Sequence, residues 1–355
     1  MKELKPFLKE LLSLPGLSGY EKPVHDVIAK TWEPLVDELS TSTVGSLQAL
    51  KIGAREGDAP NIMIATHMDA IGLIITQIVE GFLKITQVGG IDPRILPGQP
   101  VTVYGKEEIP GIIVQPPDFL LPENLAKKPV PLEHLLIDTG LLPEEVNQLV
   151  RVGDIVSFAT TPMDLDGDVI AGHTLDNRAS VAALTYCLSE LQHIKHHWNV
   201  WAVATVQEEV TLAGALTSPF NIQPDLAIAV DVTFAKGPGA TSDLETVPFG
   251  KGITIGHGPN MHPALRKALK QLADDIDMPS SMEFSTAHSG TDAYALQIVA
   301  EGIPTALLGI PLRYMHTPVE AVAMKDIKRA GRLLAEFIAR LTPEFAETIN
   351  WEETK

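Results

Sequence analysis

The sequence predicts an α/β fold, in which a mostly parallel sheet flanked by helices is interrupted by an inserted small β-barrel domain. Both ends of the chain alternate helical and strand-like segments, a pattern typical of parallel sheets covered by helices. The stretch from about residue 70 to 160 consists almost entirely of short β-type runs. At 355 residues the chain is also long for a single hydrophobic core.

The N-terminal segment predicts two helices and a strand. Leucine and phenylalanine recur at helical spacing in the first twelve residues. The sequence L-P-G-L-S-G ends that pattern, and a second helix is expected from about Glu21 to Trp32. APNIMIATH then reads as a buried strand that stops at His67.

The middle of the chain predicts a separate β module over residues 70–160. Turn-forming Gly, Pro and Asp separate the short runs GLIITQIV, FLKITQV, QPVTVYG, IPGIIV, HLLID and DIVSF. Only PEEVNQLV is helical in character. The remaining residues, 1–69 and 161–355, are then expected to form one α/β domain.

Alternation of helices and strands resumes at about residue 175. The predicted helices are DNRASVAALTYCLSELQHI, HPALRKALKQLADDI and KDIKRAGRLLAEFIARL. The predicted strands are WNVWAVATV, DLAIAVDV and IPTALLGIP. These strands would join the N-terminal strand in one sheet.

Charge and composition exclude several classes of partner. The net charge is −18 and the pI about 5.0, so the surface repels nucleic-acid phosphates and anionic membranes. MKELKPFLKELL lacks the apolar region of a signal peptide, and the apolar stretch 62–79 contains His67 and Asp69. A single cysteine allows no intrachain disulfide. We expect a cytoplasmic protein with no nucleic-acid or membrane partner.

Histidines and carboxylates stand where the apolar strands stop, and one aspartate opens a predicted helix. In open α/β sheets, sites form at the carboxyl ends of strands, so residues far apart in sequence should meet on one rim. The set is His67, Asp69, Asp176, Glu208, Glu209, Asp231 and His316.

Imidazole and carboxylate groups suit zinc or a neighbouring divalent metal. Two metals that share a bridging carboxylate need about five ligands, and five residues supply them: His67, Asp176, Glu209, Asp231 and His316. Asp69 lies two residues after His67 on a strand, so its carboxylate could fix the imidazole tautomer. Glu208 then remains as a general base.

Each of these residues alone also has an ordinary interpretation. His67 could be a satisfied core histidine, Asp176 a helix N-cap, and Glu208 with Glu209 a solvated turn. Their joint placement at strand ends is what favours a site. A second set, His193, His196 and His197, has the spacing of a metal site on a helix, but we interpret it as a solvated helix end.

Two loops allow two interpretations each. In H-S-G-T-D-A at 288–293, the glycine and Asp292 either line a substrate pocket or cap the helix that follows. G-G-I-D-P-R at 89–94 is a turn, whose Arg94 could also face a neighbouring subunit.

Several motifs together resemble the tetrahedral (TET) metallo-aminopeptidase family, some of whose members carry glutamyl aminopeptidase or endoglucanase labels. They are H-M-D, L-D-N-R, Q-E-E-V with a following G-A, P-D-x-A-I-A-x-D-V-T, G-T-D-A and P-x-R-Y-x-H. The resemblance runs from L-P-G-x-S-G to the final helix and therefore covers nearly the whole chain.

The resemblance implies a zinc-peptidase-like fold and a dinuclear site, usually of zinc or cobalt, that removes N-terminal residues from short peptides. The residue roles it implies are His67 and Asp231 on one metal, Glu209 and His316 on the other, Asp176 bridging, Glu208 as general base and Asp69 orienting His67. It also implies that residues 70–160 form a dimerisation domain. Relatives assemble six such dimers into a hollow dodecamer with inward-facing active sites.

The chain departs from the family pattern at positions that bear on substrate preference more than on the proposed ligands. Ala70 follows H-M-D where an acidic residue is usual, and Asp118 stands where relatives have histidine. Ala179-Ser180 replaces a Val-Gly pair, and Q-E-E-V continues as T-L-A-G-A.

Three other functions remain open from the residues. A deacylase or carboxypeptidase acting on N-acyl amino acids could use the same metal site. Glycoside hydrolysis could use paired carboxylates, but it would leave the histidines without a role. A non-catalytic scaffold could retain the metal ligands alone.

Overall fold

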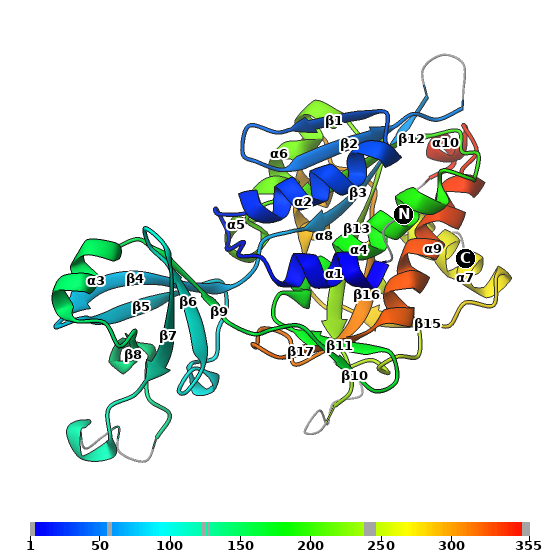
Figure 1. Ribbon diagram of the computed structural model, residues 1–355. Coiled ribbons are helices and arrows are strands. Elements are labelled where there is room, and N and C mark those ends of the chain that lie inside the picture. The colour runs from blue at the N-terminus through cyan, green and yellow to red at the C-terminus, as the bar shows by residue number, and fades with distance from the viewer. Residues whose placement is uncertain (1–3, 55–58, 123–124, 126–127, 238–245, 350–355) are drawn as a thin grey trace.

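A computed structural model describes residues 4–54, 59–122, 125, 128–237 and 246–349 of the chain. The chain forms a large α/β lobe and a smaller β lobe that projects from its side (Figure 1). Segments from both chain ends build the large lobe, and the middle of the chain builds the small one.

The large lobe is centred on an 11-stranded mixed sheet, which confirms the predicted α/β class. Its main path runs in the order β1 (Glu38–Thr41), β2 (Leu47–Lys51), β12 (Asn199–Thr205), β3 (Asn61–His67), β13 (Leu226–Phe234), β16 (Thr305–Arg313), β17 (Glu320–Ala323), β11 (Val169–Gly172) and β10 (Met163–Leu165). Two further strands, β14 (Ile253–His257) and β15 (Ser280–Phe284), pair beside β16. Parallel pairing joins the four central strands β12, β3, β13 and β16.

The central strands are buried on both faces, and separate clusters of hydrophobic side chains cover each face. On β3, Ile62 and Ile64 pack into one cluster, whereas Met63 and Ala65 pack into the other. The helices that contribute to the first cluster are α1 (Leu4–Leu12), α2 (Lys22–Trp32), α4 (Leu175–Glu190), α7 (Pro263–Asp275) and α9 (Met324–Arg340). The second face is covered by α6 (Ala213–Ile222) and α8 (Asp292–Ile298). The predicted helices and strands of this lobe are confirmed.

The small lobe is a closed barrel with its own hydrophobic core. Its strands run in the order β4 (Gly72–Val79), β5 (Phe82–Val88), β8 (Leu136–Asp138), β7 (Glu108–Val114), β6 (Pro100–Tyr104) and β9 (Ile155–Phe158). All its pairings are antiparallel. The six predicted β runs are these six strands, and the predicted helix is α3 (Pro143–Leu149).

The interpretation of the three clustered histidines as a solvated helix end is wrong. Helix α4 ends at Glu190, before any of them. His196 is buried and its Nδ1 lies 2.7 Å from the carbonyl oxygen of Trp198, while His193 and His197 are exposed. The apolar side chains of Ile194 and Trp198 pack into the core here, so the chain turns inward to start β12 rather than extend the helix.

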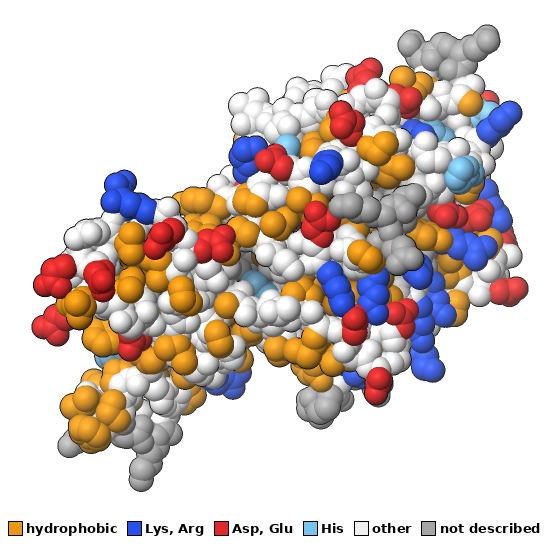
Figure 2. All heavy atoms as spheres, viewed as in Figure 1, with side chains coloured by type: hydrophobic (Ala, Val, Ile, Leu, Met, Phe, Trp, Pro, Cys, Tyr) orange, Lys and Arg blue, Asp and Glu red, His pale blue; other side chains and the backbone are white. Residues whose placement is uncertain are grey.

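Hydrophobic side chains are visible on the outer surface of the barrel, with a group at its tip (Figure 2). The exposed apolar residues of this lobe are Val79, Phe82, Ile112, Phe119, Leu120, Leu142 and Val152. Phe119 is 83% exposed, the highest value among the exposed large hydrophobic residues. Within the described part of the chain, no helix has the length and apolar character needed to span a membrane.

Candidate active site

The seven predicted site residues meet at the carboxyl ends of the central parallel strands. His67 closes β3, and Asp231 lies within β13. The two glutamates open the short helix α5 (Glu208–Thr211) just after β12. His316 follows β16, and Asp176 lies at the start of α4. The parallel register sets Thr205 of β12 beside His67, which brings the two strand ends level.

Asp176 lies between the two histidines and turns one carboxylate oxygen toward each. Its Oδ1 is 3.2 Å from His67 Nε2, and its Oδ2 is 3.3 Å from His316 Nε2. His316 Nε2 also lies 3.5 Å from Glu209 Oε2, and His67 Nε2 lies 3.7 Å from Asp231 Oδ1. One carboxylate therefore has a histidine and a further carboxylate on each side.

These side chains form groups compact enough to hold a metal ion. The ligand atoms of His67, Glu208 and Asp231 lie within 4.8 Å of one another, as do those of His67, Asp176 and Glu209. Glu209 Oε1 is buried and has no hydrogen-bond partner. A buried, unpaired carboxylate oxygen is costly in a protein interior, and coordination of a divalent cation would satisfy it. The donor set thus fits divalent metal.

A sharp turn lets both adjacent glutamates face one site. Gln207 adopts a left-handed conformation (φ 56°, ψ 34°) between β12 and α5. The Asp69 carboxylate accepts the backbone N–H groups of Glu208 (3.0 Å) and Glu209 (3.2 Å), and it also accepts the Ser18 hydroxyl. Asp69 thereby holds the backbone of both glutamates in this turn.

Asp69 also lies against the far side of the His67 ring. The His67 Nδ1 atom is 3.2 Å from the backbone carbonyl oxygen of Asp69 and 3.4 Å from its carboxylate Oδ1. A hydrogen donated from Nδ1 leaves Nε2, the atom that faces Asp176, free to bind metal.

Burial and the close packing of several carboxylates raise the pKa values of the two glutamates in the site. Burial, together with Asp231, Asp292 and Glu209, raises the pKa of Glu208 well above its usual range. Burial and Asp176 raise the pKa of Glu209 to about 8. Added positive charge would relieve this mutual repulsion.

Two buried glutamates that sequence reasoning missed hold the site together. Glu320 is 1% exposed, and its carboxylate accepts the backbone N–H groups of Asp176 (3.1 Å) and His316 (2.9 Å). Glu21 accepts the N–H of Gln207 at 3.1 Å. Neither follows an apolar strand, so the pattern that identified the other carboxylates does not apply to them.

The sequence predicts that the loop at 288–293 either lines a substrate pocket or caps the helix that follows, and different residues of the loop do each. Thr291 caps α8, its side chain accepting the N–H of Ala293, and Gly290 and Thr291 line the pocket at the site. Asp292 does neither, because it is buried and accepts a 2.5 Å hydrogen bond from Thr205 Oγ1. Burial raises its pKa to about 7.

Two glycines of the inserted segment touch the site. A Cβ atom on Gly89 would lie 3.5 Å from Glu209 Cβ, and one on Gly90 would lie 3.2 Å from His316 Nδ1. Gly89 also has a φ of +76°, which favours glycine. Arg94, by contrast, is paired with Asp92 (Nε to Oδ2, 2.8 Å) on the surface.

The unusual residues of the family motifs lie outside the ligand cluster. Ala70 is buried, and its N–H donates to the carbonyl of Gly16 at 3.0 Å. Ala179 and Ser180 are buried within α4. The side chain of Asp118 is outside the described part of the structure.

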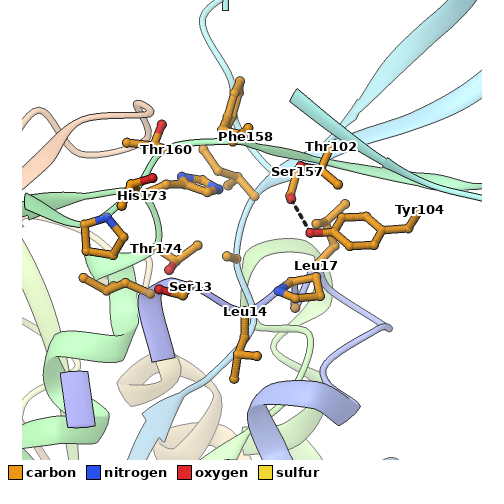
Figure 3. A pocket seen from close by; sticks show the side chains of 18 of the residues that line it. Ser13, Leu14, Leu17, Thr102, Tyr104, Ser157, Phe158, Thr160, His173 and Thr174 are labelled. Atoms are coloured by element: carbon orange, nitrogen blue, oxygen red, sulfur yellow. Dashed lines mark hydrogen bonds between the residues drawn. The ribbon is translucent and has the colours of Figure 1, made fainter. Parts of the chain in front are cut away.

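The cluster opens into a pocket of about 620 Å³. A smaller cavity of about 240 Å³ lies where the loop after α1 meets the barrel and the end of β11 (Figure 3). There Tyr104 and Ser157 share a 3.1 Å hydrogen bond, and the His173 and Phe158 rings meet edge to face. None of the seven predicted site residues lines the smaller cavity, so the candidate active site is the larger one.

Comparisons with known proteins agree with the fold. The family profile described as M42 glutamyl aminopeptidase matches residues 45–333. Lysyl aminopeptidase of Pyrococcus furiosus is 33% identical over 343 residues, covering 95% of this chain and 97% of its own.

Solved structures are similar over nearly the full length. An aminopeptidase from the archaeon Desulfurococcus kamchatkensis is 34% identical with a TM-score of 0.91, and the match covers 99% of each chain. The TET1 peptidase of Pyrococcus horikoshii, described as able to assemble into a tetrahedron or a large octahedral shell, is 30% identical with a TM-score of 0.83, covering 96% of this chain and 100% of that one. The resemblance to TET peptidases is confirmed, and the chain is a peptide hydrolase that belongs to the M42 glutamyl aminopeptidase family.

Proposed function

We propose that the protein is a dinuclear metallo-aminopeptidase that removes the N-terminal residue from short peptides. The observation that carries the proposal is the position of Asp176, whose two carboxylate oxygens face His67 Nε2 and His316 Nε2 at 3.2 and 3.3 Å. A carboxylate shared between two histidines, each with a further carboxylate beside it, matches the ligand requirement of two neighbouring cations.

Two divalent ions per chain, zinc or cobalt, would be held by the five proposed ligands. His67 and Asp231 would bind one ion, Glu209 and His316 the other, and Asp176 would bridge them. When bound, such a pair acidifies the attacking water and polarises the scissile carbonyl. The unpaired Glu209 Oε1 supports this assignment.

Glu208 is the proposed general base. Its side chain is 9% exposed, and its Oε2 lies 3.8 Å from His67 Nε2, within the same group of atoms. In this role its carboxylate would take a proton from water and return it to the leaving amine. Asp69 supports this role by holding the backbone of Glu208 and the ring of His67.

Exopeptidase specificity would depend on the free amino group of the substrate. In the proposed complex this amine sits against one of the two ions, beside the carboxylates of Glu208, Glu209 and Asp231 that line the pocket. An N-acylated substrate lacks a free amine for this position, so the proposed site suits an aminopeptidase better than a deacylase.

The barrel, residues 70–160, is the proposed dimerisation domain, and dimers would assemble further into a dodecamer. Its surface carries exposed apolar side chains, including Phe119 and Leu120. Exposed apolar side chains of this kind favour association. The self-assembling TET1 relative shares the fold over its whole length.

The proposal is tested by metal removal and replacement. The protein is treated with a chelator, dialysed and assayed on aminoacyl-p-nitroanilides and on N-acyl amino acids, with bound metal counted per chain. We expect activity on the anilides to be lost, then restored by zinc or cobalt as loading approaches two ions per chain. Activity that survives full metal removal, or hydrolysis of only the N-acyl substrates, would overturn it.

A further inference from the structure

The wall of the active-site pocket contains one carboxylate that the proposed chemistry does not use. Besides the ligand cluster and Glu208, the pocket is lined by the side chain of Glu283, which comes from β15. This strand pairs in parallel with β14, which in turn pairs with the central strand β16. Glu283 is therefore anchored on the sheet rather than on a mobile loop.

A hydroxyl and a glycine hold this carboxylate in place. Thr254 Oγ1 donates a 2.6 Å hydrogen bond to Glu283 Oε2. A Cβ atom at Gly309 would lie 2.1 Å from Thr254 Oγ1 and 2.7 Å from Glu283 Oε2, so only glycine leaves room for this pair. Gly309 lies opposite Asp231 in the parallel pairing of β13 with β16. The Glu283 carboxylate also accepts a hydrogen bond from Thr233, which lies on β13, the strand that carries the proposed metal ligand Asp231.

Glu283 has no cationic partner in the described part of the chain. No lysine or arginine is among the described residues that line the pocket, and no ion pair involves Glu283. Burial raises the pKa of Glu283, against hydrogen bonds from Thr254 and Thr233 that favour its ionised form. A carboxylate so placed is costly unless a positive charge reaches it.

The remaining walls of the pocket are largely apolar. Leu212, Phe234 and Met315 line it, together with Tyr294, whose ring centroid lies 5.2 Å from that of His288. An apolar wall leading to a carboxylate is complementary to a side chain with a hydrocarbon stem and a cationic head. Lysine and arginine have this form, whereas glutamate would be repelled by Glu283.

We propose that Glu283 selects substrates whose N-terminal residue is lysine or arginine. This inference rests on the proposed aminopeptidase function and adds the substrate class to it. The family description and the names of relatives leave this preference open, because they refer to both glutamyl and lysyl cleavage.

The test compares matched anilides of lysine, arginine, norleucine, leucine and glutamate. Norleucine has a similar hydrocarbon stem to lysine and lacks the ammonium group, so the ratio of kcat/KM for lysine over norleucine isolates the charge. We expect a preference for lysine and arginine in the native protein. In Glu283→Gln the ratio should fall roughly 10- to 100-fold, the effect of losing one charge-assisted hydrogen bond.

Further variants keep the test decisive. Glu283→Lys should shift preference toward the glutamate anilide, and Thr254→Val should reduce the lysine ratio by freeing the carboxylate. Glu301→Gln, at an exposed surface glutamate, is the matched control and should leave the ratio unchanged. Inhibition constants of free lysine and norleucine give a binding measurement that does not depend on turnover.

The outcomes separate the two proposals. Hydrolysis of the panel with a glutamate or aliphatic preference, or a lysine ratio that Glu283→Gln leaves unchanged, would overturn the role of Glu283 and leave the aminopeptidase intact. Absence of hydrolysis of every anilide by the metal-loaded protein would overturn both.

Discussion

Glu208 and Glu209 are neighbours in sequence but face different partners. Glu208 Oε2 lies 3.8 Å from His67 Nε2, whereas Glu209 Oε2 lies 3.5 Å from His316 Nε2. The left-handed Gln207 before them starts a helical turn in place of a strand. Successive side chains of a strand would have pointed to opposite faces, so this turn is what allows both glutamates to face one site, as their proposed roles of general base and metal ligand require.

Replacing Glu208 tests whether it is the general base while Glu209 is a metal ligand. Glu208→Gln keeps the size of the side chain but removes the proton acceptor, so kcat should fall by about 10²- to 10⁴-fold while bound metal per chain is unchanged. The matched variant Glu209→Gln removes a proposed ligand, and it should lower metal content. Steady-state kinetics and elemental analysis measure both effects. A near-normal kcat in Glu208→Gln would show that the base is assigned to the wrong residue.

Asp69 should matter for metal affinity although it does not face the cluster directly. Asp69→Asn places an amide group against the N–H groups of Glu208 and Glu209 and loses one acceptor. Replacing such a supporting residue typically weakens metal binding by about 10- to 100-fold. Competition titration with a chromophoric chelator measures this change. Asp92→Asn, which alters only the surface pair with Arg94, should bind metal like the native chain.

At the scale of elements, α4 and α9 cross at unusually close range. A Cβ atom on Gly331 of α9 would lie 2.3 Å from the carbonyl oxygen of Ala183 in α4 and 3.0 Å from the Tyr186 ring. Gly331→Ala should therefore lower the free energy of unfolding by about 1–3 kcal/mol, the range of overpacked sites. Urea unfolding tests this, and Lys328→Ala, at an exposed position in the same helix, is the control. Equal stability of the two variants would mean that the helices can separate without cost.

His173 follows β11 and packs edge to face on Phe158, the last residue of β9, at 4.9 Å between ring centroids. Burial and the charge of Arg178 lower the pKa of His173 to about 4, below the ordinary histidine value of 6.5. Between these two values the unfolded chain binds the proton more strongly, so the contribution of His173 to stability falls as pH falls. The loss approaches about 2 kcal/mol by pH 5, at about 1.4 kcal/mol per pKa unit.

Urea unfolding at pH 7 and pH 5 of the native chain and of His173→Gln isolates this effect. The native chain should lose more stability than the variant on acidification. An equal loss in both would show that His173 does not titrate differently in the folded and unfolded states.

Helices and strands with a strong hydrophobic pattern were predictable from the sequence, whereas short strands with a weak pattern were not. The long apolar run that ends at His67 and the periodic residues of α9 identify their elements from sequence alone. Strands β1 and β10 have four and three residues with mostly exposed side chains, and β15 mixes serine with glutamate. Such segments become strands because a neighbour completes their hydrogen bonds, which no local pattern records. For the same reason the sequence identified the clustered carboxylates at strand ends and missed Glu320, which opens a four-residue strand.

For the whole molecule, the exposed apolar side chains at the tip of the barrel predict where subunits meet. Phe119→Asp combined with Leu120→Asp places charge on residues that are 83% and 66% exposed. Light scattering after gel filtration should show a smaller assembly than the native protein forms, because charged groups are expensive to bury in an interface. Val44→Asp, an exposed apolar position of the α/β lobe, is the control. An unchanged assembly size would place the subunit contact elsewhere.

The contact of Gly89 and Gly90 with Glu209 and His316 has a consequence for protein engineering. The inserted segment is not a detachable module, because its backbone supplies part of the wall around the ligand cluster. A chimera that exchanges this barrel for that of a relative must keep glycine at both positions. Without these glycines both lobes could still fold, but the added side chains would push His316 away from Asp176.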